Sequence, residues 1–521
     1  MTWREISPDL TKDDKDKQGL NGGPMTPENV GAEFYGTLFY IVESPHEAGT
    51  IWVGSDDGLL HVTRNNGESW DDVTPEDLGG AQVNAIEVSP HDPGTVYIAV
   101  SGYKMNDFAP HVYKGTGYGR SWSKIDGDLP DDNFVRVVRE DPARQGLLYA
   151  GTEGGMYVSF DDGDNWQALD LNLPPVPITD LKIRQGDLVA ATQGRGFWIL
   201  DDLGVIRQAS DDLSSKAVHL FTPEPVTMLR TRGRAGANEG SNPPSGAVLS
   251  YYLAEETEGP LTVAIRDSNG NLVRSYSSEE GDFERCIIGN MDQRIPFEVR
   301  YPGHETGLNQ WAWDMRFTGL NCIDDVKLFA GFGGATVTPG TYTVTVAIDG
   351  AESSAELVLL PDPRVEATPE DYEFVAEKRR QATVMLNDLL TSLAAARKAR
   401  SQVRALMDDH PGDAELAAVG ESAVERLTAW EHSVTQTQYG TYEDEDSMPP
   451  MLDVQIRHVL DVIDRAGAPV SEGSLTRLSD LDYQWEDKKS ELRRISSTDL
   501  AAINDWARTN RVTHVNTVDE I

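Results

Sequence analysis

The sequence predicts a multidomain, mainly β protein: blades of a partial β-propeller, then a β-sandwich, then a C-terminal α-helical hairpin or bundle. Similar segments recur about every 40–50 residues between residues 40 and 205, and a repeat of roughly that length holding several short strands is typical of four-stranded blades. Alternating apolar and polar residues follow, and after Pro363 the apolar residues take up a helical period. The expected domains are 1–205, 206–362 and 363–521.

Each repeat contains a tight polar turn that closes on a tryptophan. The three turns are residues 63–70, 115–122 and 159–166, and each lies downstream of a turn-and-strand segment: 44–54, 89–99 and 140–150. Glycine supplies the positive φ of such a turn, and an Asp or Asn side chain hydrogen-bonds the turn backbone. We expect each tryptophan ring to pack between neighbouring blades.

These turns resemble the Asp-box, or BNR, repeat of sialidases, sortilins and related propellers. The third copy matches the pattern Ser-x-Asp-x-Gly-x-x-Trp, the first has Asn65 in place of the Asp, and the second is degraded, with Gly117 there. In families that carry it the Asp box is structural, so the resemblance implies no catalytic role for these Asp and Trp residues.

The resemblance extends to sortilin/VPS10-like, BNR-repeat proteins of bacteria and archaea that carry the label glycosyl hydrolase. It rests on the segments 54–59, 134–142, 151–159 and 191–202. Those proteins continue into a β-sandwich and a helical tail, and their exported members carry a signal peptide. The resemblance therefore implies a periplasmic or extracellular full-length protein.

The propeller repeat is shorter than expected for a closed ring of this family. Residues 1–205 hold about four blades, and Trp3 with the residues after it looks like the end of a further Asp box. The N-terminus has no basic or apolar stretch typical of an export signal. We expect the chain to be the C-terminal part of a larger propeller, or to have its open blade edge covered by a homo-oligomer.

The middle region predicts hairpins and a buried or ligand-facing tryptophan pair. Asn269-Gly270 suggests a type I′ turn between two strands, and Trp311 and Trp313 share one strand face. The Trp311 strand with the strand start at 339–342 resembles the Ig-like, FlgD-like sandwich. The pair is either core or a sugar platform, with core the commoner case. Cys286 and Cys322 either form a disulfide or remain free.

The C-terminal region predicts a Leu-rich helical hairpin or bundle. Thr368 as N-cap opens a helix to about Asp409, and further helices are expected at 413–437, 451–466, 472–495 and 498–510, the last capped by Thr498 and Asp499. The acidic run 442–447 lacks the spaced ligands of a calcium loop and is interpreted as solvated.

Composition narrows the partners. With 45 Lys plus Arg against 86 Asp plus Glu, the net charge of −41 argues against nucleic acid and anionic membranes, which need a basic face. No apolar run reaches the roughly 18–20 residues of a membrane helix. The charge therefore favours a neutral or basic ligand. The resemblance to sortilin-like propellers implies that this ligand is a peptide or a carbohydrate, and we expect no cofactor and no metal.

Standard catalytic motifs are absent from the sequence, so the candidate site comes from propeller architecture. Ligands of propellers commonly sit where inner strands and their loops meet the channel. The residues that follow those expected strands are Asp56, Asp57, Tyr103, Lys104, Asp107, Glu153, Gln193 and Arg195. For each of them a turn cap or an inter-blade ion pair is the competing interpretation.

Three functions compete at this point. The first is a non-catalytic module that binds peptide or glycan. The second is a BNR-type glycoside hydrolase, which needs two facing carboxylates and has Asp57 and Glu153 as candidates. The third is a structural subunit of an exported complex.

Overall fold

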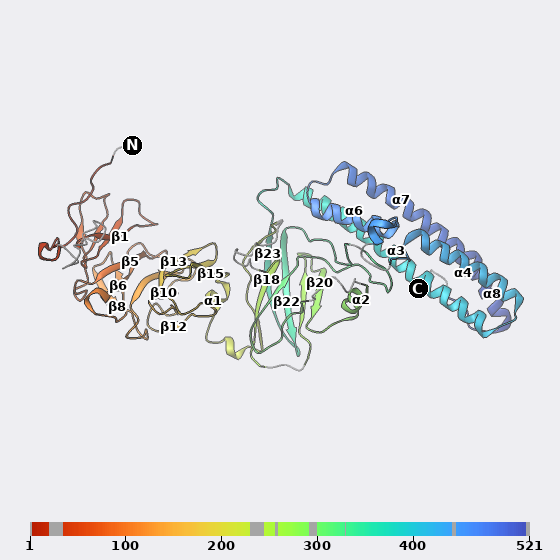
Figure 1. The fold of residues 1–521 in the computed structure, drawn as a ribbon, viewed down its shortest axis with the longest axis horizontal. Helices are drawn as coiled ribbons and strands as arrows, with labels where there is room; N and C mark the ends of the chain where they lie inside the picture. The colour runs from red at the N-terminus through yellow and green to blue at the C-terminus, as the bar shows by residue number, and fades with distance from the viewer. Residues whose placement is uncertain are drawn as a thin grey trace, which may run out of the picture. The chain divides into compact units, whose positions relative to one another are not determined.

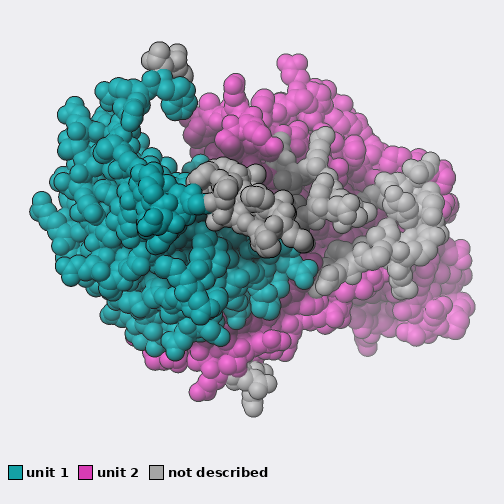
Figure 2. Space-filling view, turned by 60° about the vertical axis from the view of Figure 1, so that its left-hand side comes forward, with its two compact units in different colours: residues 1–209 teal, residues 210–521 magenta. Residues whose placement is uncertain are grey.

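The computed structural model describes residues 3–19, 35–229, 244–255, 259–290, 300–328, 330–439 and 444–516. The chain divides into two compact units, Met1–Ala209 and Ser210–Ile521, coloured separately in Figure 2. The sandwich and the helices share the second unit, so a further boundary at 362/363 remains a prediction. Among the described residues no helix is both long and apolar enough to cross a bilayer.

The first unit consists of four consecutive antiparallel sheets, which are blades of a β-propeller (Figure 1). Three blades have four strands, and the last has three. In chain order the strands are β1 (Leu38–Glu43), β2 (Ile51–Ser55), β3 (Leu60–Thr63) and β4 (Asp71–Asp72); β5 (Gln82–Val88), β6 (Val96–Ser101), β7 (His111–Thr116) and β8 (Ser121–Lys124); β9 (Val135–Glu140), β10 (Leu148–Thr152), β11 (Met156–Ser159) and β12 (Gln167–Ala168); and β13 (Ile178–Arg184), β14 (Asp187–Thr192) and β15 (Phe197–Leu200). We call them blades A to D.

The first strands of the blades lie innermost. β1 contacts β5, β5 contacts β9, and β9 contacts β13, so each blade presents its first strand to the next one. β6 and β10 are buried along their whole length, as expected for a second strand covered by a sheet on each face. This arrangement confirms the expected propeller blades.

The tryptophan of each Asp-box turn locks its blade to the preceding one. The indole Nε1 atoms of Trp70, Trp122 and Trp166 donate to the carbonyl oxygens of Ile6, Val73 and Ile125, at 2.9, 2.8 and 2.8 Å. Each acceptor lies three residues after the tryptophan position of the blade before it, and Ile6 stands in that relation to Trp3. Only the Trp166 ring is fully buried; the other two are half-buried.

The glycine of each box makes this contact possible. A Cβ on Gly163, whose φ is +93°, would lie 2.8 Å from Ile125 Cβ, and Gly67 and Gly119 meet Ile6 and Val73 in the same way. In the third box Asp161 accepts from the Ser159 hydroxyl at 2.8 Å and from the Asn165 N–H at 2.9 Å. The box residues are therefore structural.

The second unit begins with two facing sheets. One has the order β16-β18-β21 and the other β17-β23-β22-β19-β20, with β17 parallel to β23. One apolar core joins them through Leu249, Val263 and Leu357. The bounds are β16 (Val218–Leu220), β17 (Val226–Thr227), β18 (Ala247–Leu253), β19 (Thr262–Arg266), β20 (Leu272–Ser277), β21 (Gly307–Trp313), β22 (Gly340–Ile348) and β23 (Ala351–Leu360).

Two details of the sandwich test expectations from the sequence. Trp311 and Trp313 on β21 are 7% and 0% exposed, so both belong to the core and neither forms a sugar platform. The type I′ turn is wrong: Gly270 has a positive φ but Asn269 does not. The Asp267 carboxylate accepts the N–H groups of Asn269 and Asn271 instead and holds a longer loop.

The helices form antiparallel pairs along one long helix. The capping box of Thr368 and Asp371 opens α3 (Pro369–Asp409), as expected. α3 packs against α4 (Ala414–Val434), α6 (Leu452–Ala466) and α7 (Glu472–Ile495). α4 ends three residues before the expected 437 because Thr435 is extended. The acidic run lies partly outside the described residues, and 444–447 form the short helix α5.

The expected start of the last helix is wrong. Thr498 and Asp499 do not cap a new helix, because a π-helical turn, Ser496–Leu500, joins α7 directly to α8 (Ala501–Asn510). The Thr498 hydroxyl donates to the Arg494 carbonyl at 2.7 Å, and Asp499 forms an ion pair with Arg426 on α4. Thr498 and Asp499 therefore bind the Arg494 carbonyl and Arg426 from within a continuous helix and do not cap a helix N-terminus.

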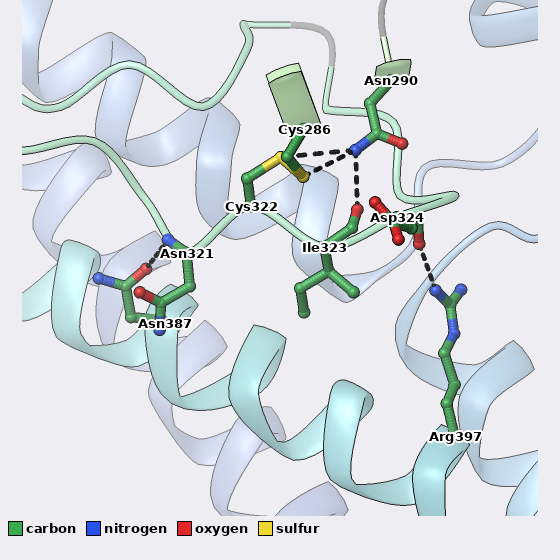
Figure 3. Close-up of a disulfide and its surroundings, with 8 residues drawn as sticks. All are labelled: Cys286, Asn290, Asn321, Cys322, Ile323, Asp324, Asn387 and Arg397. Atoms are coloured by element: carbon green, nitrogen blue, oxygen red, sulfur yellow. Dashed lines mark hydrogen bonds between the residues drawn. A yellow bond between two sulfur atoms is a disulfide. The ribbon is translucent and has the colours of Figure 1, made fainter. Parts of the chain in front are cut away.

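Cys286 and Cys322 form a disulfide, which resolves the alternative left open by the sequence (Figure 3). Cys286 lies on α2 (Asp282–Asn290), the short helix after β20. The Asn290 amide donates to the Ile323 carbonyl at 2.8 Å. The Asn321 N–H donates to Asn387 on α3 at 2.8 Å, so the disulfide fastens α2 to a segment held on α3.

Candidate binding face

The eight candidate residues follow the second strand of each blade, not the innermost strand. This corrects the sequence-based assignment: β2, β6, β10 and β14 precede them, while β1, β5, β9 and β13 are innermost. The loops after the second strands lie at the same end of the blades as the connections between blades. The Glu153 N–H donates to the carbonyl of Phe134, just before β9, and the Gln193 N–H donates to the carbonyl of Pro177, just before β13. The Asp boxes pair instead with the turns between first and second strands, at the other end of the blades.

Blades B and C together present an aromatic cluster at this end. The Tyr103 ring stacks on Phe134 with centroids 5.1 Å apart and an interplanar angle of 14°. The Phe108 ring lies 6.4 Å from Phe134 and tilted by 50°. Phe134 is buried, whereas Tyr103 and Phe108 are 39% and 47% exposed. A fixed ring therefore supports two rings that reach solvent, which we call the aromatic platform.

An ion pair borders the platform. Arg136 Nε and Nη2 both donate to Glu153 Oε2, at 2.9 and 2.7 Å, and the guanidinium carbon lies 5.0 Å from the Phe134 centroid. The Glu153 side chain is 40% exposed. The two donors fix the position of Glu153 Oε2 beside the rings.

Two further polar side chains near Tyr103 in the sequence, Lys104 and Asp107, are each hydrogen-bonded to a neighbouring side chain. Lys104 Nζ donates to Gln82 Oε1 at 3.0 Å and lies 6.0 Å from the Tyr103 centroid. Asp107 contacts His111 Nε2 at 2.8 Å, and this hydrogen bond, the largest cause, lowers the pKa of Asp107. Of the eight candidates, Tyr103 thus belongs to the platform, and Lys104, Asp107 and Glu153 lie in the same two blades.

The other four candidates stay at the flanking blades. Asp57 is fully buried, with Oδ1 accepting from the Ser55 hydroxyl at 2.5 Å and Oδ2 from the Lys12 N–H at 2.7 Å. Asp56 accepts the N–H groups of Gly36 and Thr37. These bonds favour turn capping for both carboxylates. Gln193 and Arg195 lie in the loop after β14 on blade D.

Sequence reasoning missed a charged cluster on the innermost strands. Arg139 of β9 is buried and donates to Tyr40 of β1 at 3.0 Å and to Asp180 of β13 at 2.7 Å, while Glu87 of β5 lies 3.5 Å away. Burial, the largest cause, raises the pKa of Glu87 to about 7 despite Arg139. Glu87 and Arg139 each stand two residues before Ser89 or Asp141, which follow the innermost strands of blades B and C, but the equivalent residue of blade A is the apolar Val42.

A cleft of about 520 Å³ lies in the second unit, where the segment 314–339 meets α3 and α6. Its charged groups are paired with each other: Asp464 Oδ1 lies 3.0 Å from Arg379 Nε in an ion pair, and the Asp464 carboxylate accepts from Arg316 at 3.1 Å and from the Thr336 N–H at 2.9 Å. Because these charged groups bind one another, the network favours a structural role that joins the 314–339 segment to α3 and α6 over a ligand site. Among the described residues no group of three or more His, Cys, Asp and Glu is arranged to hold a metal.

Comparisons with known proteins place the chain only distantly. No family model matches it. Over 147 residues, 28% of this chain, it is 24% identical to an oligoxyloglucan-reducing end-specific xyloglucanase of Emericella nidulans, and the match spans 18% of that protein. Structural similarity is partial. The solved structure of YCF48 from Cyanidioschyzon merolae has 18% sequence identity and a TM-score of 0.25; the match covers 32% of this chain and 53% of YCF48. The GH74 xyloglucanase from Xanthomonas campestris has 14% identity and a TM-score of 0.26; that match covers 62% of this chain and 45% of the xyloglucanase.

Proposed function

We propose that the blade unit is a glycan-binding module and that the aromatic platform of Tyr103, Phe108 and Phe134 is its contact surface. The observation that carries the proposal is the stack of Tyr103 on the buried Phe134 ring, which fixes an exposed aromatic face at a blade end. Aromatic faces bury the apolar side of a sugar ring at little entropic cost, because an aromatic side chain has only two rotatable bonds.

The polar rim gives this surface its specificity. Lys104 supplies N–H donors at one edge, and the Glu153 carboxylate, oriented by Arg136, supplies an acceptor at another. A neutral sugar carries both donors and acceptors and brings no charge into the field of a chain with net charge −41. Neutral β-glucan-type oligosaccharides are the first ligands to test, and the xyloglucan link in the name of the curated relative supports that choice.

The platform is tested by titrating xyloglucan oligosaccharides into the chain by calorimetry. Tyr103→Ala is expected to weaken binding at least about ten-fold, as for a stacking anchor worth roughly 1.4 kcal/mol or more. Tyr483→Ala is the matched control, because Tyr483 is an exposed aromatic residue, 78% exposed, on α7 of the other unit. An equal effect of both substitutions, or binding unaffected by Tyr103→Ala, would overturn the platform.

A second candidate function, glycoside hydrolysis, is favoured by the raised pKa of Glu87. A carboxyl that holds its proton near pH 7 suits a general acid, and Asp180, which is 61% exposed at the side chain and paired with Arg139, supplies a second carboxyl group in the same cluster. Turnover of a polysaccharide that is lost in Glu87→Gln and retained in Tyr103→Ala would favour this enzyme over the binding module.

We further propose that the chain works in an oxidising compartment, the periplasm or the cell exterior. The disulfide between Cys286 and Cys322 supports this, since such bonds persist where thiols are not kept reduced. Labelling of free thiols in chains isolated from the native compartment is the test. Two labelled cysteines per chain would contradict it.

A further inference from the structure

The first unit contains a blade with only three strands and, at its other end, a segment that pairs with no sheet. Blade D has only three strands, and on its last strand, β15, Phe197 and Ile199 are 79% and 57% exposed. Residues 3–10 form no strand, and the Trp3 side chain at their start is fully exposed. The described residues thus include an open sheet edge and an unpaired segment in the same unit.

The unpaired segment has the sequence of a fourth strand. In blades A, B and C the box tryptophan is followed three residues later by Val73, Ile125 or Leu169, whose N–H donates to the carbonyl at the first or second position of the third strand. Trp3 is followed at the same spacing by Ile6. From Ile6 onward the segment is already docked on blade A, because the Ile6 carbonyl accepts from Trp70 and the Lys12 N–H donates to Asp57.

We propose that residues 3–6 of one chain complete blade D of a second copy as its fourth strand. The repeat fixes the register. In blade C, Gln167 pairs with Val158 and Ala168 with Tyr157. Blade D superposes on it through the pairs Gly151 with Met156 and Ala191 with Phe197. Arg4 then pairs with the partner's Ile199, and Glu5 with the partner's Trp198.

Two further contacts follow from the same register. The Ile6 N–H donates to the partner's Phe197 carbonyl, as Leu169 does to Met156 in blade C. The Trp3 indole donates to the partner's Leu169 carbonyl, because each box tryptophan bonds the residue three positions after the tryptophan of the preceding blade. The Ile6 N–H and the Trp3 indole N–H would then make the same hydrogen bonds that the equivalent groups make in the other blades.

A second copy is the occupant that the observations favour. Each chain carries both the donor segment and the three-stranded acceptor, so a two-fold pair satisfies both chains at once. The outward residues Phe39 and Ile41 of β1, 51% and 66% exposed, would meet the exposed face of the partner's blade D, which continues the existing blade-to-blade contact. Two sets of four blades make eight, within the usual range of about four to eight.

Cysteine pairing between chains tests the register directly. Arg4→Cys chains are mixed with Ile199→Cys chains under mild oxidation, so that a mixed disulfide can form only between two molecules. Opposed residues of an antiparallel pair lie about 4.5–5.5 Å apart, within disulfide reach. We expect a crosslinked pair of twice the chain mass. The matched control mixes Arg4→Cys with Leu272→Cys, which is 54% exposed on β20 of the sandwich.

Sedimentation of the full chain gives the second readout. We expect a dimer that Trp3→Ala weakens at least about ten-fold, that Tyr483→Ala leaves unchanged, and that about 1 M salt strengthens by screening the two acidic chains. A monomer at all concentrations, or equal crosslinking with Leu272→Cys, would overturn the proposal. So would a disulfide formed within one chain by the double variant Arg4→Cys, Ile199→Cys.

Discussion

The blade interlock predicts a specific cost for adding one methyl group to the third Asp box. Gly163 has a φ of +93°, and a Cβ there would lie 2.8 Å from both Ile125 Cβ and Ile125 Cδ1 and 3.1 Å from the Ile125 carbonyl. The left-handed conformation alone costs a non-glycine residue about 1–2 kcal/mol, and forcing a methyl into a packed contact costs about 1–3 kcal/mol more. Gly163→Ala is therefore expected to destabilise blade C by roughly 2–5 kcal/mol.

Gly186 provides the control for backbone strain. Its φ is +89°, yet no atom lies within 4 Å of the position that an alanine Cβ would take, so Gly186→Ala should cost only the conformational term of about 1–2 kcal/mol. Hydrogen exchange of the full chain at increasing denaturant measures the opening free energy locally, on peptides from β11 and β12 for Gly163→Ala and on peptides from β13 and β14 for Gly186→Ala. Equal losses for the two variants would refute the view that the box glycine is needed for contact with the preceding blade.

Three further predictions follow from the buried charges and the disulfide. The folded pKa of Glu87 is raised from 4.5 to about 7, so the native state holds the proton longer and stability falls as pH rises through that interval, by up to about 3 kcal/mol; pH-dependent unfolding of Glu87→Gln should lack this fall, and an unchanged profile would contradict it. Replacing both Cys286 and Cys322 by Ser removes a crosslink over 36 residues, worth at most about 4 kcal/mol, and should speed hydrogen exchange in α2 while leaving the blades unchanged; unaltered α2 exchange would count against the disulfide as its anchor. Asp464→Asn leaves the buried Arg379 without its charge partner and should lower the stability of the second unit by about 3–5 kcal/mol in thermal unfolding, whereas Asp505→Asn on the exposed surface should change it little; similar melting of both variants would contradict the network.

Repetition made the first unit predictable from sequence. The recurrence of Trp70, Trp122 and Trp166 and their glycine turns indicates blades, because each turn must satisfy the same inter-blade contact. The same spacing predicts that Trp3 ends a further Asp box, and this stays a prediction. The innermost strands were misassigned, because strand order within a blade depends on inter-blade packing that a local pattern does not contain.

Predictions made from short local motifs were wrong where contacts with residues outside the motif determine the structure. Asn269-Gly270 predicts a two-residue turn, but the neighbouring Asp267 side chain captures two backbone N–H groups. Thr498 and Asp499 look like a cap, but packing against α4 keeps the helix continuous. At the candidate site, Tyr103 was found from its place after a strand, whereas its support, Phe134, comes from a connection between blades and is visible only in three dimensions.

The most direct test of the glycan-binding account is a calorimetric titration of xyloglucan oligosaccharides into the wild-type chain and into Tyr103→Ala. The account predicts saturable binding to the wild type, weakened at least about ten-fold by the substitution, because the exposed Tyr103 face is held in place by Phe134. Binding of equal strength to both chains, or no binding of neutral oligosaccharides to the wild type, would contradict it.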